Sequence, residues 1–95
     1  MSDSDLFGFE DALGQLRYGD KLARKGWNGA GQFIFYVPEN KYHASGNKKG
    51  TLLGMFPDDM VPYQAYLAMK TAQDTVVPWL ASQTDLLAKD WYIVE

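Results

Sequence analysis

Cysteine is absent from this chain of 95 residues. Without thiols the chain can form no disulfide framework, no thiolate zinc site and no cysteine nucleophile, and this composition fits a reducing compartment. Long hydrophobic runs are also missing, since no segment approaches the roughly 18 apolar residues of a membrane span. Residues 1–11 hold four acids and no base, unlike the start of a signal peptide. We therefore expect a soluble, cytoplasmic protein.

Basic residues are fewer than acidic residues, nine against twelve. The net charge is −3 and the isoelectric point is near 5.0. Binding to a DNA or RNA polymer rests on many Lys and Arg contacts to phosphate, so this charge argues against a broad nucleic-acid surface. A small anionic ligand is compatible with this charge, because it needs only one or two cations and a few backbone N–H groups.

Patterns typical of catalysis or metal binding are lacking too. The single histidine, His43, stands in a polar segment with no orienting partner nearby in the sequence. There is no Gly-rich phosphate loop, no metal-ligand spacing and no paired-carboxylate pattern, and Asp58-Asp59 predicts a solvated turn. We therefore expect a protein that is not an enzyme and that needs no cofactor.

Apolar and aromatic residues are abundant, at 46% and 15% of the chain. This composition is that of a globular protein, and the length predicts one domain over residues 1–95. Residues 1–5 are expected to fray. Residues 39–62 predict an irregular loop or lid, because so long an irregular stretch in a small domain is usually functional. A chain this small also gains stability from self-association.

The hydrophobic pattern predicts an α+β fold: a small antiparallel β-sheet with an N-terminal amphipathic helix and a short C-terminal helix. The first helix is expected to end at Gly19, and Pro78 suggests an edge strand or a bulge. The aromatic strand at 32–37 is expected to be covered on both faces. The predicted helices lie at residues 9–18 and 82–88, and the predicted strands at 21–25, 32–37, 66–71, 75–80 and 91–94, with a turn at 26–29.

Arg24 and Trp27 form the first candidate binding feature. They lie three residues apart at the junction of a strand and a turn, which can place a cation and a flat ring on one side of a pocket. A nucleobase stacks on an indole for about 1–3 kcal/mol, and an arginine matches a phosphate oxygen pair. The alternative is that Trp27 belongs to the core and Arg24 is a solvated strand residue.

The segment from Ser82 to Asp85 is the second candidate. The hydroxyls of Ser82 and Thr84 at a helix start could hold an anion or a sugar hydroxyl. The alternative is a capping box, in which Ser82 and Asp85 bond each other's backbone N–H groups and do nothing else. The remaining aromatic residues are expected to fill the core, namely Trp79, Trp91, Phe33, Phe35 and Tyr92.

Two segments carry a family resemblance. Arg24-Lys25-Gly26-Trp27-Asn28-Gly29 and Val77-Pro78-Trp79-Leu80-Ala81-Ser82-Gln83-Thr84-Asp85 are long and unusual, and Tyr66 to Ala72 and Asp90-Trp91 add to them. Together they resemble the second class of Thoeris anti-defence proteins, which are small phage-encoded proteins. The resemblance runs from the Phe9 helix to the carboxyl terminus and is poorest over residues 39–62.

The resemblance implies a sponge, which holds a cyclised ADP-ribose signal in the infected bacterial cell without cleaving it and so keeps the downstream effector silent. It also implies homo-oligomers, typically tetramers, with ligand pockets between subunits, and in some members a separate site for cyclic oligonucleotides. Rival functions are a protein–protein inhibitor of a host enzyme and, more distantly, a hydrolase of the signal. By position, the resemblance implies that Trp27 and Asn28 hold the base or its ribose and that Arg24 holds the diphosphate. Ser82, Thr84 and Asp85 would hold the sugar hydroxyls and the phosphate edge. Gly29 and Gln83 complete the two binding segments.

Overall fold

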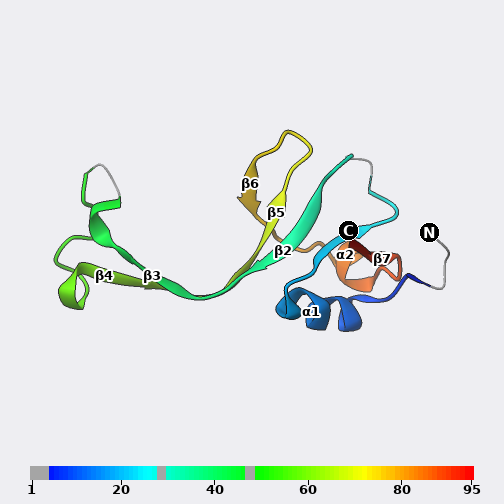
Figure 1. Cartoon of the computed structure of the whole chain (residues 1–95), viewed down its shortest axis with the longest axis horizontal. Helices are drawn as coiled ribbons and strands as arrows, with labels where there is room; N and C mark the ends of the chain where they lie inside the picture. The colour runs from blue at the N-terminus through cyan, green and yellow to red at the C-terminus, as the bar shows by residue number, and fades with distance from the viewer. Residues whose placement is uncertain (1–4, 28–29, 47–48) are drawn as a thin grey trace.

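The computed structural model describes residues 5–27, 30–46 and 49–95 and confirms the predicted α+β fold (Figure 1). One antiparallel sheet of five strands has the order β6-β5-β2-β1-β7, and a second sheet pairs β3 with β4. No helix formed by the described residues has the length and apolar character to cross a membrane. The elements are α1 (Phe9–Tyr18), β1 (Lys21–Arg24), β2 (Phe33–Val37), β3 (Asn40–His43), β4 (Met60–Tyr63), β5 (Tyr66–Lys70), β6 (Val76–Pro78), α2 (Gln83–Leu87) and β7 (Trp91–Val94).

Helix α1 forms and ends where the sequence predicts. Its spacing buries Ala12 and Leu16, and acidic residues occupy its first turn, as the helix dipole favours. Gly19 adopts the left-handed conformation, with φ of 113°, and its N–H bonds the Leu16 carbonyl at 3.0 Å. The helix therefore stops at the residue whose missing Cβ makes this turn easy.

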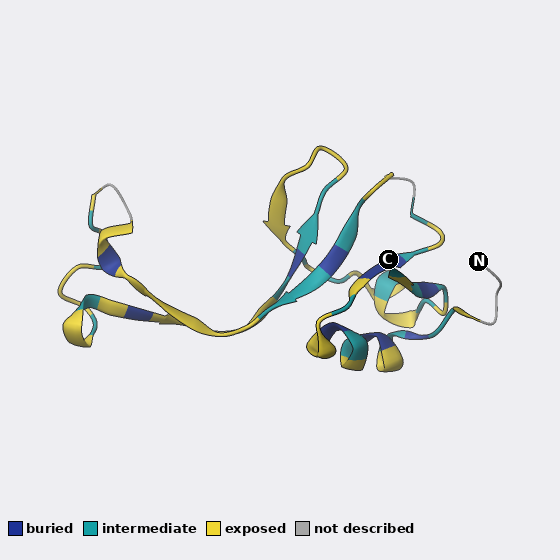
Figure 2. Ribbon diagram, viewed as in Figure 1, coloured by how far each residue is buried: buried dark blue, intermediate teal, exposed yellow. Residues whose placement is uncertain are grey.

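The core lies between α1 and one face of the five-stranded sheet (Figure 2). Among the aromatic residues that the structure describes, only Trp91 is completely buried, and Trp79 is half-buried at the edge of the core. Because side chains alternate along a strand, the neighbours of buried Ile34 point to the other face. The prediction that five aromatic residues fill the core is therefore wrong for Phe33, Phe35 and Tyr92, which are half-buried outside the core cluster. The face of β2 that carries Phe33 and Phe35 is covered only in part.

The first and last strands of the chain pair side by side. β1 and β7 are antiparallel, with Arg24 opposite Trp91 and Leu22 opposite Ile93. This pairing brings the turn after β1 next to the segment that joins α2 to β7. At the other edge of the sheet lies β6, which holds Pro78, so the edge position expected for this proline is confirmed.

Residues 39–62, expected to be an irregular loop or lid, contain two strands. β3 and β4 form a narrow ribbon that projects from the ends of β2 and β5, away from the helices (Figure 1). We call residues 39–46 and 49–65 the arm. Turns join its strands, and one of them includes Asp58 and Asp59, both in the left-handed conformation with φ of 55°. Asp58 is exposed, as the predicted solvated turn expects, and Asp59 is half-buried.

Candidate functional site

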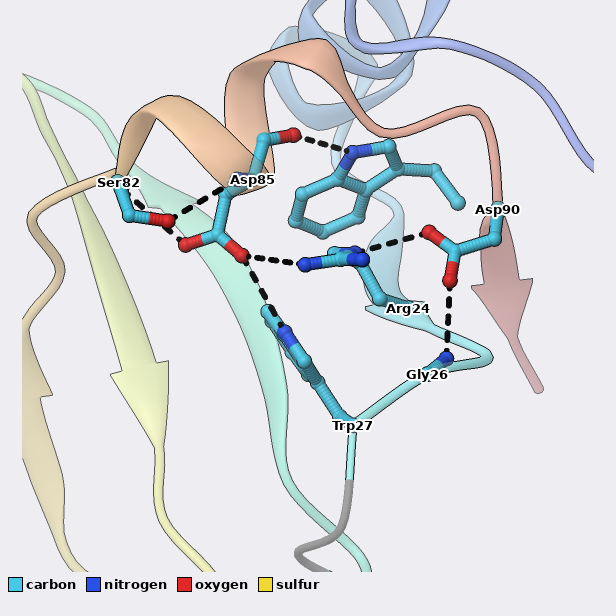
Figure 3. Close-up of polar contacts among 7 residues, drawn as sticks. Arg24, Gly26, Trp27, Ser82, Asp85 and Asp90 are labelled. Carbon is cyan, nitrogen blue, oxygen red and sulfur yellow. Dashed lines mark hydrogen bonds and ion pairs between the residues drawn. The ribbon is translucent and has the colours of Figure 1, made fainter.

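Arg24 is held between two carboxylates at the end of β1 (Figure 3). Its Nε donates to Asp90 Oδ1 at 2.8 Å, and its Nη1 donates to Asp85 Oδ1 at 2.9 Å. The second oxygen of Asp90 accepts from the Gly26 backbone N–H at 2.9 Å. Nothing among the described residues bonds Arg24 Nη2, so this nitrogen is the part of the guanidinium that another molecule could use.

Ser82 and Asp85 form the capping box that the sequence predicts. Ser82 Oγ accepts from the Asp85 N–H at 3.0 Å, and Asp85 Oδ2 accepts from the Ser82 N–H at 3.2 Å. The Asp85 carboxylate thus has one oxygen on the cap and the other on Arg24. The backbone carbonyl of Asp85 accepts from the Trp91 indole N–H at 3.0 Å. This short helix is therefore fixed to β1 and to the core through one residue.

Trp27 closes the cluster from the turn after β1. Its ring is half-buried and meets Trp91 edge to face, with 5.3 Å between ring centroids. Its indole N–H points at Asp85 Oδ1 over 3.4 Å, a long and weak hydrogen bond. The alternative in which Trp27 packs against the core therefore describes its position, and its role in binding a ligand stays a prediction.

The contacts within the cluster favour the ionised forms of Arg24, Asp85 and Asp90. Burial raises the pKa of Asp85, but hydrogen bonds from Arg24, Ser82 and Trp27 outweigh burial and hold this pKa below its ordinary value. The pKa of Asp90 is lowered in the same way, against burial, by Arg24 and the Gly26 N–H. The hydrogen bond to Asp90 is the main cause that raises the pKa of Arg24. Two carboxylates facing one guanidinium leave the cluster with a net negative charge.

A hollow of about 200 Å³ opens beside this cluster, at the end of the sheet. Arg24 and Trp27 contribute to its wall, as do Lys25 and Tyr92. Enclosed sites for ligands of drug size occupy about 300–1,000 Å³, so this hollow alone is too small to bury a dinucleotide. The complete lining is Ala23, Arg24, Lys25, Trp27, Ala30, Gly31, Gln32 and Tyr92.

The structure brings four of the eight residues predicted for the site into one network: Arg24, Trp27, Ser82 and Asp85. Gln83 and Thr84 lie exposed in the first turn of α2. The predictions for Asn28 and Gly29 lie outside the described residues.

Sequence reasoning missed Asp90, the second partner of Arg24. Only the pairing of β1 with β7 brings residue 90 beside residues 24–26, and that pairing leaves no local signal in the sequence. It also missed the contribution of Lys25 and Tyr92 to the hollow.

Comparison with known proteins adds a family to this geometry. Residues 7–94 match the Thoeris anti-defense 2-like domain. The chain belongs to this family. A similar curated protein, named Thoeris anti-defense 2, comes from Bacillus phage SP01. It is 35% identical over 86 residues, which cover 90% of this chain and 92% of that protein. Membership in this anti-defence family supports a role against Thoeris defence, exercised in the infected host cell, and its name suggests an inhibitor.

In this Thoeris anti-defense 2-like chain we expect the Ser82→Ala change to lower the free energy of unfolding by about 0.5–2 kcal/mol, because it removes the acceptor for the Asp85 N–H. Thr84→Val is the matched control, since Thr84 is exposed and takes no part in the cap, and its effect should stay within about 0.5 kcal/mol. Urea unfolding measures both. Equal stability of the two variants would contradict a structural role for the cap.

Acid should weaken the cluster. The folded-state pKa values of Asp85 and Asp90 lie below the unfolded value of about 3.9, so their stabilisation is present above that value and is lost as the pH falls through the folded-state pKa values. Stability measured by urea unfolding should fall from about pH 5 downward, and Asp90→Asn should flatten this dependence. Asp58→Asn is the control, because Asp58 is exposed in a turn of the arm, away from the cluster, and its left-handed backbone conformation accepts asparagine. Parallel curves for wild type and Asp90→Asn would contradict the role of Asp90.

Proposed function

We propose that this protein is a non-catalytic sponge, which binds a cyclised ADP-ribose signal, holds it intact and so blocks Thoeris defence. The observation that carries the proposal is the network that joins Arg24 and Trp27, which line one hollow, to Asp85 at the start of α2, in a chain whose relative is named Thoeris anti-defense 2. Adenine, ribose and diphosphate call for a flat ring, hydroxyl partners and a cation, and these residue types lie together here.

The ligand would bind to those polar groups and ring faces that the hydrogen bonds and ring contacts within the cluster do not already use. Arg24 offers Nη2 to the diphosphate, and the face of Trp27 that does not meet Trp91 offers a surface for the base. The side chains of Gln83 and Thr84 are exposed in the first turn of α2, and in this proposal they would bond the sugar hydroxyls. Ser82 and Asp85 hold the wall of the site in place. The negative charge of the cluster means that these contacts act by direction and shape more than by net attraction.

We also propose that the site is completed by a second protomer, in a homo-oligomer that we take to be a tetramer. Support comes from the size of the hollow, about 200 Å³, which falls short of what a dinucleotide needs. A ligand held at this hollow would therefore need further walls from a second protomer.

Sequestration without cleavage is supported by the chemistry of the cluster. None of its members is a thiol or an imidazole. Elsewhere, His43 Nδ1 lies 2.8 Å from Ser45 Oγ, but it also accepts from the Ser45 backbone N–H, and both residues are exposed on the arm. No described carboxylate bonds His43 Nε2, so the pair lacks the third group that orients a catalytic histidine.

Analysis of the released ligand tests the proposal. The purified protein is incubated with cyclised ADP-ribose, separated from free ligand and denatured by heat, and the released compound is identified by mass spectrometry. A sponge returns the intact signal in a fixed ratio to protein chains. Release of a cleaved product would show a hydrolase, and retention of no small molecule would favour the protein–protein inhibitor. Tyr18→Ala, on an exposed residue at the end of α1, is the matched control and should release as much as wild type.

A further inference from the structure

Asp90 takes two donors at the end of β1 that a phosphate would otherwise use. Its Oδ1 accepts from Arg24 Nε at 2.8 Å, and its Oδ2 accepts from the Gly26 backbone N–H at 2.9 Å (Figure 3). Guanidinium and backbone N–H groups are the donors that bind phosphate oxygens in many proteins. The Asp90 carboxylate therefore stands where two oxygens of a phosphate would bind.

The backbone holds Asp90 in this position. Its carbonyl accepts from the Lys25 backbone N–H at 3.0 Å. The next residue, Trp91, is completely buried and lies opposite Arg24 in the pairing of β1 with β7. A ligand that displaced the carboxylate would break two charge-assisted hydrogen bonds, each about twice as strong as a neutral one. We therefore expect Asp90 to stay on Arg24 when the site is occupied.

The hydrogen bonds of Arg24 allow a ligand one contact and no more. Arg24 Nη2 shares one edge of the guanidinium with Nε and another with Nη1, and each of these two nitrogens already holds a carboxylate. A phosphate can thus accept from Nη2 but cannot form the bidentate pair that arginine usually gives. A Cβ on Gly26 would lie 3.6 Å from Nη2, so the missing side chain of this exposed glycine keeps Nη2 accessible.

The charges around the hollow cancel. The cations Arg24 and Lys25 both line it. Asp85 and Asp90 bond Arg24, so these four formal charges sum to zero. A terminal phosphate carries about −1.5 to −2 at pH 7, whereas a phosphate bonded on two sides carries a single negative charge. The four groups supply no surplus cation for the larger charge, and they therefore match a phosphate that is not terminal.

We propose that Asp90 is a specificity-determining residue, which excludes nucleotides with a terminal phosphate, such as ADP and ATP, from the site of the sequestered signal. The inference rests on the proposed function, since it concerns the same site beside Arg24. Each phosphate of a cyclised ADP-ribose is bonded to a ribose and to the other phosphate, so neither is terminal and the contact from Nη2 can serve it. A sponge needs this selectivity, because ATP is far more abundant in a cell than a signalling nucleotide and would otherwise fill the site.

Calorimetric titration with ADP tests the proposal through a gain of binding, which the loss of a purely structural contact would not produce. Asp90→Ala frees Arg24 Nε and the Gly26 N–H, so it should bind ADP about ten- to a hundredfold more tightly than wild type does. Asp11→Ala is the matched control, because it removes the same charge from an exposed position in α1 and should bind ADP as weakly as wild type. Wild type that binds ADP as tightly as folded Asp90→Ala would overturn the proposal.

Asp90→Asn provides the second variant and serves if circular dichroism shows that Asp90→Ala is unfolded. It keeps the size of the side chain and an acceptor for Arg24 Nε but removes the charge, so its affinity for ADP should rise by a smaller factor. No rise in either folded variant would overturn the proposal.

A parallel titration with cyclised ADP-ribose separates this inference from the sponge proposal. Wild type that binds the signal and also binds ADP as tightly as the Asp90 variants contradicts only the exclusion by Asp90. Wild type that binds neither compound, together with a gain of ADP binding in the Asp90 variants, contradicts only the sponge. We expect wild type to bind the signal tightly and ADP weakly.

Discussion

Arg24→Ala should lower the free energy of unfolding by about 2–4 kcal/mol. Breaking a buried ion pair by removing one partner costs about 3–5 kcal/mol, because the other charge is left buried and unpaired. Here the exposed fractions of the side chains are 16% for Arg24, 14% for Asp85 and 27% for Asp90, so partial solvation reduces the effect. Urea unfolding at pH 7 measures the change. We expect retention of the signal to be lost as well, because the turn after β1 and the start of α2 are no longer joined.

Two matched variants separate charge from geometry at this position. Arg24→Lys keeps the positive charge, but a single ammonium cannot reach both carboxylates as Nε and Nη1 do, so we expect only part of the stability to return. Arg24→Ala combined with Asp90→Asn removes one of the two stranded charges and should be more stable than Arg24→Ala alone. If Arg24→Ala stays within about 0.5 kcal/mol of wild type, the network contributes nothing to the fold.

Trp27→Ala should weaken both the fold and retention of the signal. Truncating a fully buried tryptophan costs about 3–5 kcal/mol, and half-buried Trp27 should cost about half of that, through its lost packing on Trp91. If the free face of the ring stacks on the base of the signal, the affinity should fall a further roughly 5- to 150-fold, corresponding to about 1–3 kcal/mol. Calorimetric titration, at a temperature where the variant is folded by circular dichroism, measures the second effect.

Trp27→Phe is the matched control for this position. It keeps an aromatic ring against Trp91 and removes only the long hydrogen bond to Asp85, so the fold should change by about 1 kcal/mol or less. Affinity should stay much closer to wild type than in Trp27→Ala. Wild-type affinity in folded Trp27→Ala would mean that the ring is part of the core alone and that the signal binds elsewhere.

Local patterns in the sequence determined much of the framework. The spacing of Ala12 and Leu16, with Gly19 behind them, was enough to place α1, because helix periodicity and the glycine end signal act over a few residues. The capping box of Ser82 and Asp85 was visible for the same reason. The strands of the main sheet were also placed to within a few residues, and β2 was marked by its aromatic and β-branched residues. The family could be named from two unusual segments, and the comparison confirmed it.

Only the tertiary structure decided how these pieces meet. The pairing of β1 with β7 joins the two ends of the chain, and through it Arg24 gains Asp90 and Trp27 gains Trp91. Contacts between residues more than sixty positions apart leave no local pattern, so the sequence could indicate a cation and a ring but not that two carboxylates already hold the cation. The arm escaped prediction for a related reason. Its strands carry no alternating apolar pattern, because no surface of the same chain covers them.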